Sequence, residues 1–294
     1  MNQPLMTSPS GRVFVLGSHI AYSLSPVIQN SAFKAAGSSI RYGIRDIGEE
    51  SFDEELKSIK QMEDLLGFNV TIPFKERIIS YLSELDFQAK LTGAVNTVRR
   101  QDDIGHASLA GYNTDVNGVV ASLSKLRLKG NGLEAVIIGS GGAARGCLAG
   151  LLNNGFDAVK ILNRTEDRGK KLALEFSDKF PKKKVQADVL SRETFDNALR
   201  EEVDLLVNTI PGRAVLPFDI KLQSASSAMR VFDVNYTSSE SPILMEARRN
   251  SLVCIDGLLM LVEQAAKSFE IWTGIAAPRE TMLRAAESAR RAKN

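Results

Sequence analysis

The segment VIIGSGGAARG at residues 136–146 restricts the fold of this chain more than any other stretch of its sequence. It follows an apolar run typical of a buried strand and opens a segment with helical character. Gly139 permits a tight turn, Gly141 lets the main chain approach a pyrophosphate, and Ala144 is small enough for close packing of helix on strand. The N–H groups and the helix dipole at such a turn favour an anion. We therefore expect a dinucleotide site here, and a tight strand–helix turn without a ligand is the alternative.

The end of the next predicted strand, NRTEDRGKK at residues 163–171, distinguishes between two cofactors. An NAD site usually places Asp or Glu about 20 residues after the glycines, where the carboxylate binds the ribose 2′-hydroxyl. Arg164 occupies that place in this chain, and a guanidinium pairs well with a phosphate dianion. We therefore predict NADP rather than NAD, with Glu166 and Asp167 facing solvent in the first turn of the following helix.

Strand-like and helix-like segments alternate along the chain, which predicts an α/β protein with a mainly parallel sheet. The length of 294 residues suggests about two domains. In the first predicted helix, Ser25 is expected at the N-cap and Pro26 at the first helical position. The predicted strands are residues 12–17, 41–47, 67–71, 134–139, 158–165, 203–212, 230–236 and 251–257, and the predicted helices are residues 25–37, 51–63, 119–130, 141–155, 167–180, 258–274 and 278–292.

Composition excludes several classes of protein. The net charge is +2 and no basic stripe is present, so we expect no nucleic-acid partner. No apolar run approaches the ~20 residues of a membrane span, and the N-terminal segment lacks the apolar region of a signal peptide, so a cytoplasmic protein is expected. The two cysteines, Cys147 and Cys254, are too few for a disulfide framework and lack the spacing of a metal site. No bound metal is predicted.

Four segments outside the predicted nucleotide-binding region are polar near the ends of predicted strands. Taken singly, each has a structural explanation, because serines cap helices, asparagines occupy turns, and an aspartate such as Asp115 caps a helix. Loops at strand ends on a rigid scaffold are also where binding sites are usually built. The four segments are SLSP at 23–26, NVTIPFK at 69–75, GAVNT at 93–97 and GYNTD at 111–115.

In this order, the four segments resemble those of the shikimate dehydrogenase family, and the resemblance extends from about residue 13 to residue 272. The segments GSHIAYSLSP, GSGGAAR, NRT and DGLLMLVEQAAKSF are similar to further blocks of the family. NVTIPFK followed by GAVNT and GYNTD is highly specific, whereas the glycine turn alone is not. The resemblance implies a substrate domain of residues 1–118 completed by 258–294, with a Rossmann-type NADP domain of residues 119–257 inserted in it.

The implied reaction is reversible, NADP-dependent reduction of 3-dehydroshikimate to shikimate, in chorismate and aromatic amino acid biosynthesis. Lys75 and Asp115 are implied as the catalytic pair. Hydride delivery to a ketone builds negative charge on oxygen, which an ammonium group stabilises while it donates a proton. The resemblance implies substrate contacts by Ser23, Ser25, Thr71, Lys75, Asn96, Asp115, Tyr236 and Gln264. It implies cofactor contacts by Gly139, Ser140, Gly141, Gly142, Ala143, Ala144, Asn163, Arg164, Thr165, Arg168 and Gly257.

Several positions depart from the family pattern and leave alternatives open. His19 stands where the family usually has proline, Tyr22 where it has histidine, and Ser238 where it has proline. The loop at 208–213 is shorter than usual. The alternatives are a quinate/shikimate dehydrogenase that uses NAD or NADP, an enzyme acting on a related ring acid with an amino group, and a non-catalytic NADP-binding regulatory protein. The only partner expected for any of the enzymes is a small-molecule substrate, and the chain is expected to be a monomer or a homodimer.

Overall fold

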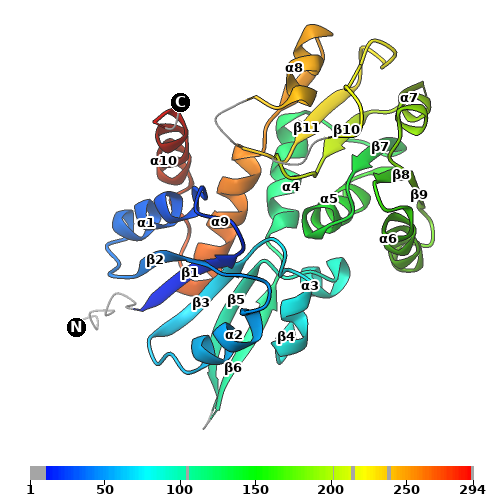
Figure 1. Cartoon of the computed structure of the whole chain (residues 1–294). Coiled ribbons are helices and arrows are strands. Elements are labelled where there is room, and N and C mark those ends of the chain that lie inside the picture. The colour runs from blue at the N-terminus through cyan, green and yellow to red at the C-terminus, as the bar shows by residue number, and fades with distance from the viewer. Residues whose placement is uncertain (1–10, 104–105, 201, 213–215, 237–239, 293–294) are drawn as a thin grey trace. The chain divides into compact units, whose positions relative to one another are not determined.

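The computed structural model describes residues 11–103, 106–200, 202–212, 216–236 and 240–292. The chain divides into two compact units, which are described separately below. The first unit comprises the residues up to Thr114 together with those from Val262 onward, and the second comprises Asp115–Leu261. Each unit is an α/β structure built on one mainly parallel sheet (Figure 1). The predicted α/β fold class is confirmed.

Within the described residues, the sheet of the first unit has the strand order β2-β1-β3-β5-β6-β4. The strand β1 pairs in parallel with both β2 and β3, whereas β5 is antiparallel to β3 and β6. The hairpin of β5 and β6 was not predicted, because the sequence of β5 is charged rather than apolar beyond its first two residues. The strands are β1 (Arg12–Gly17), β2 (Arg41–Asp46), β3 (Leu65–Val70), β4 (Glu84–Leu85), β5 (Thr97–Asp103) and β6 (His106–Tyr112).

The helices of this unit come from both parts of the chain. The early helix α1 packs against the late helix α10, as Figure 1 shows. Two buried hydrogen bonds tie α9 to the early segments, from Gln29 Nε2 to the Ala265 carbonyl and from Trp272 Nε1 to the Val98 carbonyl, both at 2.9 Å. The helices are α1 (Ser25–Ala35), α2 (Phe52–Lys60), the 3-10 helix η1 (Arg77–Tyr81), α3 (Phe87–Thr92), α9 (Leu258–Thr273) and α10 (Arg279–Arg291).

The start of α1 differs from the prediction. Leu24 occupies the N-cap and Ser25 is the first helical residue. The Ser23 hydroxyl accepts the hydrogen bond from the Ser25 N–H at 3.2 Å. The prediction of Ser25 as N-cap was therefore wrong by one residue, because the serine two positions before it satisfies the first free N–H of the helix.

The sheet of the second unit is parallel throughout its described strands, with the order β12-β11-β10-β7-β8-β9. Counted from β7, this is the order 3-2-1-4-5-6 of dinucleotide-binding folds, in which the order reverses between β7 and β10. Ligands bind such sheets beyond the carboxyl ends of the strands at that point. The strands are β7 (Leu133–Ile138), β8 (Phe156–Asn163), β9 (Lys184–Val189), β10 (Leu205–Asn208), β11 (Arg230–Asp233) and β12 (Val253–Ile255).

Small residues allow α4 and α5 to pack closely in this unit. A Cβ added to Gly146 would lie 2.8 Å from Asp115 Cβ, and one added to Gly150 would lie 2.7 Å from Val119 Cγ1. The helix α4 begins at Asp115, four residues before the predicted start, and ends by Lys125, near the left-handed backbone of Arg127 (φ 58°). The helices of this unit are α4 (Asp115–Lys125), α5 (Gly142–Leu152), α6 (Glu166–Lys179), α7 (Arg192–Arg200) and α8 (Pro242–Arg249).

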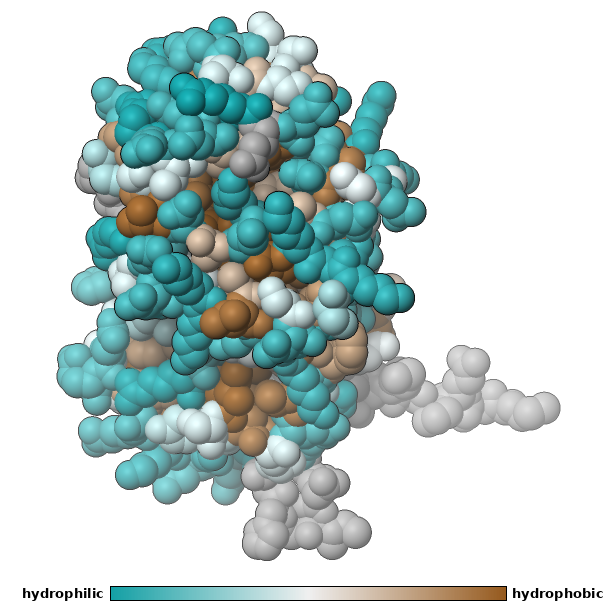
Figure 2. Space-filling view, turned by 90° about the vertical axis from the view of Figure 1, so that its right-hand side faces the viewer, coloured by the Kyte–Doolittle hydropathy of each residue, from teal (hydrophilic) through white to brown (hydrophobic). Residues whose placement is uncertain are grey.

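On the face shown in Figure 2, the hydrophobic residues of the described part of the chain form small areas that hydrophilic residues separate. Among the described residues, no helix is long and apolar enough to span a membrane, and no group of acidic, histidine and cysteine side chains could hold a metal ion. Cys147 is buried and Cys254 is half-buried, both as free thiols. Ser238 lies outside the described residues.

Candidate active site and cofactor site

The glycine turn follows β7 as the sequence predicts. Gly139 has a φ of 107°, a left-handed conformation that favours glycine, and its N–H donates to the Leu162 carbonyl at 2.8 Å. Gly141 occupies the N-cap of α5 and is exposed, and a Cβ added to it would have no atom within 4 Å. Ala144 is fully buried against the sheet. The residues present therefore fit a dinucleotide, with exposed main chain at a helix N-terminus and open space above it.

A substitution at Gly141 tests the cofactor site with little effect on the stability of the fold. We expect Gly141→Ala to change the free energy of unfolding by no more than about 1 kcal/mol, since its φ of −84° suits alanine. The added methyl group would enter the open space that the pyrophosphate needs. NADP binding should therefore weaken at least about tenfold, or about 1.4 kcal/mol. Fluorescence titration with NADPH measures this, and Gly43→Ala, on a strand of the first unit, is the control. Unaltered affinity would contradict a pyrophosphate at Gly141.

The turn after β8 presents the residues that were predicted to select NADP. Arg164, Thr165 and Arg168 are exposed, and Asn163 Nδ2 donates to the Thr165 carbonyl at 2.7 Å, which fixes the turn. Glu166 pairs with Lys170 one helical turn along α6 at 2.7 Å, and this partner raises the pKa of Lys170. Glu166 is thus paired on the helix surface, and the exposed Arg164 and Arg168 outnumber the one exposed acid of the turn, Asp167.

A partly buried ion pair joins α5, the helix after the glycine turn, to α6. Arg145 on α5 is 7% exposed, and its Nη1 lies 2.6 Å from Glu175 Oε2 on α6. The hydrogen bond from Arg145 lowers the pKa of Glu175 against the opposing effect of burial. Sequence reasoning placed Arg145 within a motif but gave it no role. The sequence could have indicated this role, because Arg145 is a charged residue inside an otherwise apolar helix, and a buried charge needs a partner.

In the first unit, a polar network crosses the interior from β2 to α9. Tyr42 donates to Asn69 Oδ1 at 2.6 Å, and Asn69 Nδ2 donates to Thr97 Oγ1 at 3.0 Å and Ser268 Oγ at 3.1 Å. Thr97 and Ser268 are themselves 2.7 Å apart through their hydroxyls, and Ser268 lies 3.4 Å from Thr114 Oγ1. Such a satisfied network fixes side chains in one arrangement.

Two predicted substrate residues, Asn96 and Gln264, belong to this network. The Asn96 amide nitrogen donates to Thr114 Oγ1 at 2.9 Å and to Gln264 Oε1 at 3.0 Å. Its oxygen accepts the Thr114 N–H at 2.8 Å. Both N–H groups of Asn96 are therefore used within the protein, and Gln264, half-buried on α9, is left with Nε2 as the end that faces away from Asn96. The structure brings these two residues together, as predicted for a common substrate site.

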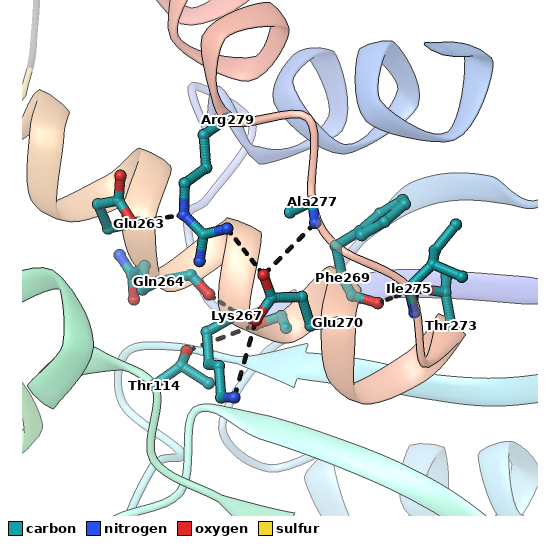
Figure 3. Close-up of polar contacts among 11 residues, drawn as sticks. Thr114, Glu263, Gln264, Lys267, Phe269, Glu270, Thr273, Ile275, Ala277 and Arg279 are labelled. Carbon is teal, nitrogen blue, oxygen red and sulfur yellow. Dashed lines mark hydrogen bonds and ion pairs between the residues drawn. The ribbon is translucent and has the colours of Figure 1, made fainter. Parts of the chain in front are cut away.

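The helix that carries Gln264 is held by the first residue of α10. Arg279 donates to Glu263 Oε2 at 3.0 Å and to Glu270 Oε1 at 2.8 Å, so it spans two turns of α9 (Figure 3). Glu270 also lies 3.7 Å from Lys267. The hydrogen bond that Arg279 donates to Glu270 is the largest of the effects that raise the pKa of Arg279. Figure 3 shows Gln264 on α9 between this cluster and Thr114.

Lys75 lies in the loop after β3 and is half-buried. The preceding Phe74 is buried and stacks on Phe52 at 4.4 Å between ring centroids. The Lys75 carbonyl accepts from Val95 N at 2.8 Å, directly before Asn96, which in turn binds the main chain of Thr114. Asp115, the next residue, is buried and begins α4. The backbones of Lys75 and Thr114 are thus anchored to the same two-residue segment.

The serine loop lies between β1 and α1. Ser23, Ser25 and Thr71 are all half-buried, and the Thr71 N–H donates to the Leu16 carbonyl at 2.9 Å. His19 has a φ of 57°, which proline cannot adopt because its ring holds φ near −65°. A proline at this position would therefore require a different backbone in this loop.

Asp46, which sequence reasoning missed, holds this loop in place. Its Oδ1 accepts the His19 N–H at 2.6 Å and its Oδ2 accepts the Ile20 N–H at 2.9 Å. Hydrogen bonds to a charged group contribute about 1.5–3 kcal/mol each. We expect Asp46→Ala to release the loop and to raise the KM for the acidic substrate about tenfold with little change in kcat. Steady-state kinetics tests this against Asp53→Ala, an exposed acid of the same unit. An unchanged KM would contradict the role.

The last two predicted residues lie in the second unit. Tyr236 is half-buried, three residues after β11 ends. Gly257 follows β12, and its N–H donates to the Asn235 carbonyl at 2.9 Å. The loop after β10 is described as far as Gly212, so Arg213 at its end lies outside the described residues.

Three family models match successive parts of the chain. They are described as the shikimate dehydrogenase substrate binding domain at residues 15–98, shikimate/quinate 5-dehydrogenase at 122–211, and the shikimate 5′-dehydrogenase C-terminal domain at 257–287. A shikimate dehydrogenase (NADP+) of Bacillus subtilis is 37% identical over 266 residues, which cover 88% of this chain and 90% of that protein. The chain belongs to the shikimate dehydrogenase family.

Solved structures of shikimate dehydrogenases agree with this membership. One that was crystallised with NADP+ has a TM-score of 0.83 and 32% identity, over 96% of both chains. The enzyme of Thermus thermophilus in complex with shikimate has a TM-score of 0.78 and 31% identity, over 95% of this chain and 98% of that one. The resemblance inferred from the sequence motifs is therefore confirmed.

Proposed function

We propose that this chain catalyses the reversible, NADP-dependent reduction of 3-dehydroshikimate to shikimate. The observation that carries the proposal is the presence in one chain of two sets of residues. One set is the glycine turn with Arg164 after the next strand, in a sheet of the dinucleotide-binding order. The other is the polar network that holds Asn96 and Gln264. The solved relatives that contain NADP+ and shikimate support the same ligands.

Lys75 and Asp115 are the residues to which we assign proton transfer. When bound, NADPH supplies the hydride. As negative charge develops on the substrate carbonyl oxygen, the Lys75 ammonium stabilises it and donates the proton. Asp115 orients that ammonium and accepts from a neighbouring ring hydroxyl. The main-chain bond from Val95 to the Lys75 carbonyl, at 2.8 Å, supports a fixed position for the loop, which catalysis by positioning requires.

The other predicted residues take supporting roles in this proposal. Ser23, Ser25 and Thr71 hold the substrate carboxylate, with Tyr236, through hydroxyl groups. Gln264 offers its Nε2 to a ring hydroxyl, and Asn96 orients Gln264 through their 3.0 Å hydrogen bond. Arg164 and Arg168 pair with the 2′-phosphate of NADP, and Gly257 meets the nicotinamide through its main chain. Such bonds to substrate hydroxyls also provide discrimination, because an analogue that lacks them leaves polar groups unpaired.

One assay tests the function directly. The purified chain is supplied with NADP or NAD and with shikimate, quinate or an unrelated 2-hydroxy acid, and cofactor reduction is followed by absorbance. We expect the highest kcat/KM for shikimate with NADP. Faster turnover of quinate would favour the quinate/shikimate alternative. A preference for NAD would contradict the role of Arg164, and binding of NADPH without turnover of any of the three would favour a regulatory protein.

A further inference from the structure

A buried carboxylate lies at the carboxyl ends of β10 and β11 in the second unit. Asp233, the last residue of β11, is 0% exposed. Its Oδ1 accepts from Asn208 Nδ2 at 3.1 Å, from the Asn235 N–H at 3.0 Å and from Asn235 Nδ2 at 2.6 Å. Burial raises the pKa of Asp233 against these donors and the Ser241 hydroxyl. A buried acid on an apolar strand lowers stability unless donors bind it, and here all three of these donors come from the two asparagines that flank the loops.

The two asparagines extend this contact into the loops that follow. Asn208 Oδ1 accepts the Ile210 N–H at 3.2 Å, and Asn235 Oδ1 accepts the Gly212 N–H at 2.8 Å. Asn235 Nδ2 also donates to the Ile210 carbonyl at 2.9 Å. The Asn235 carbonyl accepts the hydrogen bond from Gly257 N. One carboxylate thereby links the loops after β10, β11 and β12.

The place of these loops in the sheet indicates what they hold. Under the proposed function, the glycine turn after β7 takes the pyrophosphate and Arg164 after β8 takes the adenosine 2′-phosphate. A dinucleotide spans both halves of such a sheet across the point where the strand order reverses. The nicotinamide half of NADP therefore falls on β10, β11 and β12, whose loops Asp233 links.

We propose that Asp233, Asn208 and Asn235 form a brace of positioning residues that orients the nicotinamide half of NADP for hydride transfer. The brace acts through the main chain of Ile210, Gly212 and Gly257. The inference rests on the proposed function, and it adds residues to which neither the sequence motifs nor the family resemblance gave a role. Because it sets the direction of the nicotinamide ring, the brace affects transfer of hydride rather than capture of the adenosine half.

The test compares a ligand that has the nicotinamide with one that lacks it. Asp233→Ala removes the brace, Asn235→Ala removes its half-buried arm, and Asp233→Asn keeps an oxygen acceptor in nearly the same shape. Binding of NADPH and of adenosine 2′,5′-bisphosphate is measured by titration, and kcat and KM by NADP reduction. We expect the two alanine variants to bind the bisphosphate within about twofold of the parent, while kcat falls about ten- to a hundredfold. Asp233→Asn should restore most of the activity.

The matched control lies at the opposite end of the same sheet. Asp204 precedes β10 and accepts the Glu134 N–H at 2.8 Å, so Asp204→Ala removes a similar bond away from the carboxyl ends. We expect it to leave hydride transfer near the parent value. Equal loss of NADPH and bisphosphate binding in the brace variants, full hydride transfer in them, or the same defect in Asp204→Ala would each overturn the proposal. If Asp233→Ala does not fold, Asn235→Ala decides the outcome.

The binding measurements also separate this proposal from the proposed function. A parent chain that binds NADPH but does not oxidise shikimate would contradict the substrate, and the comparison of NADPH with the bisphosphate would still test the brace. A parent chain that binds the bisphosphate and gains no affinity from the nicotinamide half would overturn the brace itself.

Discussion

Lys75→Ala is expected to lower kcat about 10²–10⁴-fold, because it removes the proposed donor of the proton and the charge that stabilises the oxyanion. NADP binding should stay near normal, since Lys75 lies in the first unit and the glycine turn in the second. Single-turnover kinetics with 3-dehydroshikimate and NADPH measure the step itself, and NADPH titration measures cofactor affinity. Turnover at the parent rate would contradict the assignment of Lys75.

Two further variants make this result specific. Lys75→Met keeps the apolar stem of the side chain, so a loss of rate in both Lys75 variants reports the missing ammonium rather than lost packing. Lys34→Ala removes an exposed lysine of α1 in the same unit and should leave kcat unchanged. Thermal unfolding of all three variants shows whether the fold is retained.

Gly257→Ala is expected to destabilise the protein by about 3 kcal/mol or more, as overpacking against main chain does. A Cβ added at this position would lie 1.9 Å from the Val234 carbonyl oxygen and 2.4 Å from its carbon. Backbone atoms of the loop after β11 would have to move, because no flexible side chain is available to yield. Denaturant unfolding measures the change in the free energy of unfolding.

Gly141→Ala provides the comparison for this variant. It adds the same methyl group at a site that has no atom within 4 Å, and it should leave stability nearly unchanged. Together the two alanines separate a glycine required by packing from one required by a ligand. Equal stability of Gly257→Ala and the parent chain would show that the loop after β11 has another conformation available.

The local sequence was sufficient to predict most of the second unit. Strands such as β7 and β8 are continuous apolar runs, and the glycines of the turn can be interpreted without knowledge of distant contacts. The same holds for β1 and β3 of the first unit. The hairpin of β5 and β6 was missed because β5 carries charged residues, and its pairing with β3 on one side and β6 on the other is not encoded in its own pattern.

The candidate site was predictable only in part, because contacts between residues distant in the sequence complete it. Asn96 and Gln264 were named from motifs 168 residues apart, and the structure joins them at 3.0 Å. Asp46 and Asp233 were missed, because each binds a segment that is distant in the sequence. Asp46 is 27 residues from His19, and Asp233 is 25 residues from Asn208. The sequence does hold one signal for Asp233, which is an acid that closes an apolar strand. The roles of Lys75 and Asp115 in proton transfer remain predictions.

The division of the first unit between the two ends of the chain has a consequence for biogenesis. A ribosome synthesises β7 to β12 before it reaches α9, so every strand of the second sheet exists before the first unit receives its last two helices. Gln29 on α1 and Val98 on β5 must meanwhile wait for their hydrogen-bond partners Ala265 and Trp272 on α9. Nascent chains would therefore expose the apolar surface that α9 covers until the last helices emerge, which is the kind of surface that chaperones bind.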